Sequence, residues 1–145
     1  MNNLNNVFDK NVSLDNGKTN DDALITANPT KMILDAAGIA KFKDEYKNDP
    51  SLKEKLSSIN AVNNNQVYLQ MPFNAYYTNL EIALMDAYFI SSIAYPEKYI
   101  NVNLEEKYNE ISEKFLGVKC FDLIKSKPTC KSGFQNVGSL LDFMS

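Results

Sequence analysis

The sequence predicts a helix-rich α/β domain in which helices flank a small, mainly parallel sheet. A chain of 145 residues, 44% of them hydrophobic, is long enough for one core. Two short apolar runs, residues 31–35 and 66–71, are bounded by proline, glycine or asparagine, which is typical of strands. Amphipathic segments lie between these runs, so we expect a right-handed crossover that joins a parallel pair of strands.

The first elements follow from punctuation residues. Residues 1–18 hold few apolar side chains and predict a loose leading segment, whereas residues 19–145 form the domain. Acidic residues at positions 21 and 22 favour a short helix of residues 19–27, which Asn28-Pro29 ends. The apolar run 31–35 then predicts a buried strand with Asp35 at its carboxyl end.

Two helices and a second strand follow. Ile39, Phe42 and Tyr46 share one face of a helix of residues 39–47. Asp49 and Pro50 are the preferred cap and first residue of another helix. Three consecutive asparagines, residues 63–65, predict a turn before the second strand.

The second half of the chain predicts two longer helices. Thr78 and Glu81 form a capping box before the longer one, and Pro96 ends it. Asn103 caps the other helix, which Gly117 ends. Residues 118–145 show little periodicity. The side chains expected to be buried are Leu80, Ala83, Leu84, Ala87, Tyr88, Ser91 and Ala94 in the longer helix, and Leu104, Tyr108, Ile111 and Phe115 in the other.

The composition favours binding over catalysis. The chain has no histidine, and since all 15 basic residues are lysine it has no arginine either. It therefore lacks the usual side chain for acid–base chemistry near neutral pH and the bidentate group for phosphate or carboxylate. A net charge of −3 gives no basic surface for nucleic acid, and no apolar run is long enough to span a membrane.

The loop between the second strand and the longer helix is the candidate binding site. It carries Asn74, Tyr76, Tyr77 and Asn79 at the carboxyl end of a strand, where ligands bind in open α/β sheets. Asp35 ends the first strand and is expected at the same edge. In the alternative interpretation the tyrosines pack onto the sheet edge, Thr78 only caps the helix and Asp35 only forms a turn or cap.

Several segments together resemble one family of binding proteins. They are Asn28-Pro29 followed by KMILDAAG, the run SINAVNNNQVYL before the second strand, the tyrosine-rich loop, and AYPEKY after the longer helix. Over about residues 19–118 the chain resembles the carboxyl-terminal lobe of ABC-transporter substrate-binding proteins of the iron-siderophore and cobalamin class, closest to those that bind iron complexes.

The resemblance implies one lobe of a two-lobed extracytoplasmic receptor that closes slightly on a metal chelate. The amino-terminal lobe and any signal peptide are then expected to lie outside this chain. The loop residues Asn74, Tyr76, Tyr77 and Asn79 would line the cleft. Without arginine, aromatic stacking, amides, lysine or the missing lobe must hold the ligand, which leaves a ferric chelate, haem or a corrinoid. The resemblance implies no resident cofactor and no enzymatic activity.

The resemblance also implies partner proteins. Receptors of this class dock on the ABC permease through an acidic residue on each lobe, and that position falls on Asp22. The other interpretation of Asp22 is a first-turn charge of its own helix. We also expect the isolated lobe to form a homodimer through the apolar surface that would face the missing lobe.

Cys120 and Cys130 are the two cysteines of the chain. An exported protein folds in an oxidising compartment, where a disulfide between them would stabilise the fold by about 2 to 3 kcal/mol. The other interpretation is a pair of ordinary thiols, one of them buried. Two further functions remain open: a cytoplasmic protein-interaction domain whose tyrosine-rich loop binds a partner, and an enzyme fragment that uses Asp35 with a tyrosine.

Overall fold

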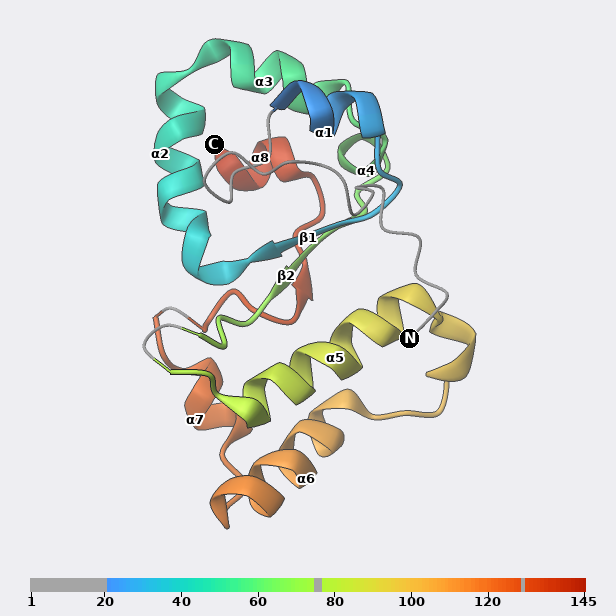
Figure 1. The fold of residues 1–145 in the computed structure, drawn as a ribbon, viewed down its shortest axis with the longest axis vertical. Coiled ribbons are helices and arrows are strands. Elements are labelled where there is room, and N and C mark those ends of the chain that lie inside the picture. Colours follow the sequence, from blue (N-terminus) through green and yellow to red (C-terminus); the bar gives the residue numbers. More distant parts are fainter. Residues whose placement is uncertain (1–20, 75–76, 129) are drawn as a thin grey trace. The chain divides into compact units, whose positions relative to one another are not determined.

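The computed structural model describes residues 21–74, 77–128 and 130–145, and the side chains from residue 23 onward (Figure 1). It is a helix-rich α/β structure, as the sequence predicts, with a small mixed sheet. No helix within the described ranges is long and apolar enough to cross a membrane. The elements are α1 (Asp21–Ala27), β1 (Met32–Asp35), η1 (Ala36–Gly38), α2 (Ile39–Asn48), α3 (Pro50–Ser57), α4 (Asn60–Asn63), β2 (Val67–Gln70), α5 (Leu80–Ala94), η2 (Pro96–Lys98), α6 (Leu104–Leu116), α7 (Phe121–Lys125), β3 (Gln135–Asn136) and α8 (Leu140–Met144).

The described chain divides into two compact units, and the three strands pass between them. Unit 1 consists of the described residues up to Met32 together with Ala40–Tyr68 and Asn136–Ser145. Unit 2 consists of Ile33–Ile39 and Leu69–Gln135, without the undescribed positions. Each unit has its own group of buried apolar side chains, so each is described by itself below.

The sheet has the order β1-β2-β3. The Met32 N–H donates to the Gln66 carbonyl and the Val137 N–H to the Val67 carbonyl, both at 3.0 Å. Because β1 and β2 both run from unit 1 into unit 2, they are parallel, as predicted, whereas β3 runs back. The sheet is therefore mixed, and the prediction of a mainly parallel sheet was wrong. The antiparallel strand was missed because the short β3 has no sequence pattern of its own.

The two predicted strands differ in burial. Val67 and Leu69 of the central strand β2 are completely buried. The strand predicted at residues 31–35 is present as β1, but its predicted burial was wrong. It lies at the sheet edge, and its side chains alternate between half-buried and exposed. A strand with a neighbour on one side only is covered less well.

Unit 1 is held together around the turn that follows α1. Asn28 adopts a left-handed backbone with a φ of 41°, and its side-chain oxygen accepts the Asn60 N–H at 2.7 Å. The Pro29 carbonyl accepts the next amide, that of Ala61, at 2.9 Å. Asn28 and Pro29, which the sequence predicts as a helix stop, therefore also fix the start of α4. The buried apolar side chains of this unit are Tyr46, Leu56, Ile59, Ala61, Val62, Val67, Leu140 and Met144.

Helix α3 begins as its sequence predicts. Asp49 is the N-cap, its carboxylate accepts the Ser51 N–H at 2.9 Å, and Pro50 is the first helical residue. An acceptor at this position satisfies one of the amide groups that have no partner within the helix. Helix α4 was not predicted, because a single turn of helix is too short to show periodicity.

Unit 2 is built on the helices α5 and α6, which pack against each other, and α7 packs on α6. The predicted buried stripe of α5 was wrong in phase: Leu80 is 62% exposed and Leu84 is also exposed. The buried face instead carries Ile82, Met85, Asp86 and Phe89. The helix is apolar on several sides and the buried face contains an aspartate, so hydrophobic periodicity could not identify the correct face.

The start of α5 also differs from the prediction. The N-cap is Asn79 rather than Thr78, and its side chain makes no capping hydrogen bond. The Asn79 N–H is instead directed to the Phe73 carbonyl at 2.7 Å, which closes the preceding loop. The capping box of Thr78 and Glu81 is therefore not formed, and Thr78 is exposed.

Helix α6 confirms its predicted boundaries. Asn103 accepts the amides of Glu105 and Glu106, and Gly117 takes the left-handed conformation at the C-cap with a φ of 75°. Tyr108 and Ile111 are buried as expected, but Phe115 is 51% exposed, so its predicted burial was wrong.

Candidate functional site

The candidate site is the loop of residues 71–79, which joins β2 to α5 in unit 2. Its root is fixed: Met71 is completely buried, and its N–H donates to the Asp86 carboxylate at 2.9 Å. The bond between the Asn79 N–H and the Phe73 carbonyl brings its two ends together. The two ends of the loop are therefore fixed by hydrogen bonds of the Met71 and Asn79 amides, while the side chains of Asn74, Tyr77 and Asn79 are exposed.

The predicted binding residues of this loop are exposed where the structure describes them. The Tyr77 ring is 87% exposed, and Asn74 and Asn79 are exposed as well. The alternative in which the tyrosines pack onto the sheet edge is therefore wrong for Tyr77. Tyr76 lies outside the described residues. The described residues of the loop thus expose the Tyr77 ring and the amide side chains of Asn74 and Asn79 to solvent.

Asp35 has the role that its alternative interpretation describes. Its Oδ1 atom accepts the Ala37 N–H at 2.8 Å and caps the short helix η1. The side chain is exposed, so the cap leaves its second oxygen available to solvent. Its charge also acts on Asp86, whose pKa it raises. Asp35 therefore lies close enough to α5 to influence the group that anchors the loop.

Asp86 is the site residue that the sequence analysis missed. It is 4% exposed, and its Oδ1 atom accepts the Met71 amide, whereas Oδ2 has no hydrogen-bond partner within the described part of the chain. The pKa of this carboxyl is raised to about 7, and burial is the main cause. The hydrogen bond from the Met71 amide lowers the pKa, and the charge of Asp35 raises it. An aspartate among apolar residues of a helix was the only sequence sign of this role.

Tyr108 of α6 is the neighbour of Asp86 in this buried region. Burial is the largest cause of the raised pKa of Tyr108, and the negative charge of Asp86 is the second. The two groups therefore interact electrostatically. The Tyr108 hydroxyl has no hydrogen-bond partner among the residues described. Two buried polar atoms of unit 2 are therefore unsatisfied in the same neighbourhood, which is unusual in a folded protein.

Exposed apolar side chains extend from the loop along unit 2. Leu80 and Leu84 lie one helical turn apart at the start of α5 and follow the exposed Tyr77. The last turn of α6 exposes Phe115 and Leu116. Because α5 and α6 are consecutive helices packed side by side and run in opposite directions in Figure 1, the start of α5 and the end of α6 lie at the same end of this helix pair.

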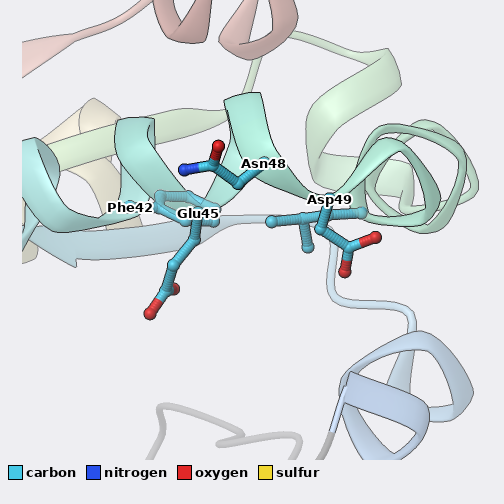
Figure 2. A pocket seen from close by; sticks show the side chains of 5 residues that line it. Phe42, Glu45, Asn48 and Asp49 are labelled. Atoms are coloured by element: carbon cyan, nitrogen blue, oxygen red, sulfur yellow. The ribbon is translucent and has the colours of Figure 1, made fainter.

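A surface hollow of about 330 Å³ lies in unit 1, where α2 meets α3. Figure 2 shows that the carboxylates of Glu45 and Asp49 at this hollow point in different directions. Glu45 is 3.6 Å from the Lys41 ammonium, and Asp49 accepts the Ser51 amide and hydroxyl, which lower its pKa. These polar groups do not converge on a common point, so the hollow is not a candidate site. Its lining residues are Phe42, Glu45, Asn48, Asp49 and Leu52.

Two predicted sites remain untested by the structure. Cys120 and Cys130 are both partly buried and are present as thiols, not as a disulfide, so a bridge between them stays a prediction for oxidising conditions. The side chain of Asp22, the predicted contact with the permease, lies outside the described residues. Within the described ranges, no cluster of acidic or cysteine side chains is suited to hold a metal ion.

No protein-family model matches the chain, and no curated protein shows significant sequence similarity to it.

Proposed function

We propose that this chain is the carboxyl-terminal lobe of the substrate-binding component of an ABC importer for an iron complex or a similar flat metal chelate. The observation that carries the proposal is the Tyr77 ring, 87% exposed in a loop that follows the carboxyl end of β2. A ligand that covered this ring would release water from a large apolar area, which favours binding.

The chemistry of the loop fits such a ligand. Tyr77 offers a flat face for stacking, and the amides of Asn74 and Asn79 offer both donors and acceptors. These groups suit a broad, conjugated or amide-bearing chelate better than a compact anion, which would need an arginine fork or a cluster of lysines. The proposal places the protein outside the cytoplasm, with the amino-terminal lobe and the permease as its partners.

The test is direct titration of the protein with haemin, cyanocobalamin and a ferric catecholate, followed by optical absorbance. The variant is Tyr77→Ala, and the matched control is Tyr95→Ala, which removes a half-buried tyrosine at the other end of α5. We expect one chelate to bind, with an affinity about tenfold weaker in Tyr77→Ala, since an aromatic contact contributes on the order of 1 kcal/mol. The control should retain the affinity of the unmodified protein.

Two outcomes would contradict the proposal. One is that none of the three chelates binds at millimolar concentration, where even one wall of a cleft should retain a ligand. The other is an equal loss of affinity in Tyr77→Ala and Tyr95→Ala, which would indicate that the loop is not the contact.

A second candidate function is a protein-interaction domain. The observation that favours it is the row of exposed apolar side chains at the start of α5, where Leu80 and Leu84 follow Tyr77. A protein partner would cover this row and the loop together, whereas a chelate would contact the loop alone. Leu84→Glu therefore separates the two functions: it should abolish binding to a protein partner and leave the chelate affinity unchanged.

A further inference from the structure

The carboxyl group of Asp86 connects the middle of α5 to the root of the binding loop. Its Oδ1 atom accepts the Met71 N–H at 2.9 Å, and both residues are buried. Met71 directly follows β2, so this hydrogen bond lies where the chain leaves the strand and enters the loop. The amide has no strand partner here, and the side chain of Asp86 takes the place of a neighbouring strand.

Met71 is held from a second side by Gly133. A Cβ atom on Gly133 would lie 2.5 Å from the Met71 Cγ and 3.3 Å from its Cα, so the two backbones approach as closely as only glycine permits. The Lys125 ammonium donates to the carbonyls of Gly133 and Lys131 and holds this segment in place. Met71 is therefore confined by packing, and Asp86 provides the polar contact that orients its amide.

The surroundings of Asp86 do not favour a negative charge. Oδ2 has no hydrogen-bond partner in the described structure, and no lysine contributes to the charges that act on the carboxyl. From the end of β1 the like charge of Asp35 acts on it, and from α6 the hydroxyl of Tyr108 interacts with it.

The other charged groups near α5 are engaged elsewhere. Lys107 of α6 forms an ion pair with Glu110 and lies over the Tyr88 ring, 5.7 Å from its centroid. Tyr99, which follows η2, acts on Tyr108. Ionised Asp86 would thus be a buried carboxylate with one unsatisfied oxygen and no cation assigned to it, a state that costs several kcal/mol in a protein interior.

We propose that Asp86 is a positioning residue that holds the binding loop in a proton-dependent way. The uncharged carboxyl is tolerated in its buried place beside Met71. The ionised carboxyl accepts the Met71 amide more strongly but is not hydrated there, so loss of the proton favours an opening of the loop that admits water to Asp86. Proton uptake therefore orders the edge that carries Tyr77 and Asn79. What the loop binds rests on the proposed function, whereas the effect of Asp86 on the loop does not depend on it. The raised pKa, about 7, places this transition near neutral pH.

The test is amide hydrogen exchange of the protein without any ligand, corrected for intrinsic rates, at about pH 6 and about pH 8.5. The amides of Met71 and Asn79 report on the loop, and the Ile111 amide in α6 reports on global unfolding. We expect the two loop amides to be less protected than Ile111, and their protection to fall about tenfold or more at the higher pH, as linkage to a carboxyl titrating near 7 requires.

Three variants complete the test. Asp86→Asn keeps the acceptor for Met71 but cannot ionise, so its loop protection should be the same at both pH values. Asp35→Asn removes the like charge and keeps the cap of η1, so the pKa of Asp86 should be lower and the fall in protection between the two pH values should be smaller. Asp122→Asn, a change at an exposed carboxyl on α7, should behave as the unmodified protein.

The proposal is overturned if the loop amides show the same protection at both pH values, or if Asp86→Asn retains the full pH dependence. It is also overturned if the loop amides exchange only together with Ile111, because the loop would then have no separate opening for the carboxyl to control. Haemin titration at the same two pH values is read separately. Failure of every chelate to bind would reject the proposed function and leave the exchange result standing.

Discussion

The ring of Phe134 stacks on the ring of Tyr108, with their centroids 4.5 Å apart and their planes inclined by 18°. Phe134 also contacts Phe89 in an edge-to-face arrangement, at a centroid separation of 5.3 Å. It makes these contacts from a left-handed backbone with a φ of 54°, a conformation that a bulky residue seldom adopts. The aromatic contacts of unit 2 therefore offset a local backbone strain in the segment before β3.

Phe134→Ala should lower the free energy of unfolding by about 2 to 3 kcal/mol, because it removes the ring contacts with Phe89, Tyr108 and Phe121 and part of the buried area. Urea denaturation followed by circular dichroism measures the change. Phe115→Ala is the matched control: the same substitution at a half-exposed ring should cost less than about 1 kcal/mol. Equal losses in the two variants would show that the stacking contributes nothing specific.

Gly133→Ala should destabilise unit 2 by about 1 to 3 kcal/mol, because the new methyl group overlaps the Met71 side chain and approaches its backbone. Gly38→Ala is the control, since a Cβ there meets no atom within 4 Å. We expect Gly38→Ala to leave thermal stability unchanged or slightly raised. If Gly133→Ala melts at the temperature of the unmodified protein, the close approach to Met71 is not a constraint.

Asp86→Asn should change the pH dependence of stability in one direction. The folded-state pKa of about 7 lies above the ordinary aspartate value of 3.8, so the unfolded chain loses this proton first as pH rises. The stability that the protonated carboxyl allows is complete below about pH 4, declines as the pH rises toward 7 and is lost above 7. Relative to the unmodified protein, Asp86→Asn should therefore gain up to about 4 kcal/mol between pH 4 and pH 8. Urea titrations at both pH values test this, and a constant difference between the two proteins would refute it.

Oxidation should join Cys120 to Cys130. In the sequence the two cysteines flank α7, and both side chains are partly buried. After incubation with oxidised glutathione, we expect no reactive thiol on the denatured protein and an increase in stability of about 2 to 3 kcal/mol over the reduced form. A Cys130→Ser variant should show no such increase. Two reactive thiols after oxidation would remove the bridge from consideration.

Local capping chemistry made most helix ends predictable. Asp49 with Pro50, Asn103 and Gly117 act where the sequence places them, because each satisfies backbone groups of its own helix. The start of α5 is the exception. There the Asn79 amide bonds to the Phe73 carbonyl, a contact set by the fold of the loop rather than by Thr78.

Burial was harder to predict because it depends on distant residues. Helix α5 has apolar residues on several faces, and its packing within unit 2, against α6 and Phe134, selects Ile82, Met85 and Phe89 over Leu80 and Leu84. The short β3 and the left-handed Phe134 have no local pattern that would distinguish them from loop.

The candidate site was predictable in part. The position of the loop could be predicted because a strand pattern ends shortly before a helix pattern. The exposure of Tyr77 was expected because such a loop lies at the carboxyl end of a strand. The anchor of that loop does not, since Asp86 looks like a surface residue until the fold buries it beside Met71. A carboxyl that acts on a segment 15 positions earlier in the chain leaves no trace in local spacing.

Neither compact unit is a continuous stretch of polypeptide. The chain moves from one to the other at Met32, Ile39, Tyr68 and Gln135, so the first unit is assembled from three pieces and the second from two. A single proteolytic nick within the described chain therefore cannot release either unit intact, and neither can be produced by choosing new end points. Separating them would require rejoining fragments in a new order, and the strands that would have to be cut are the three that form the sheet.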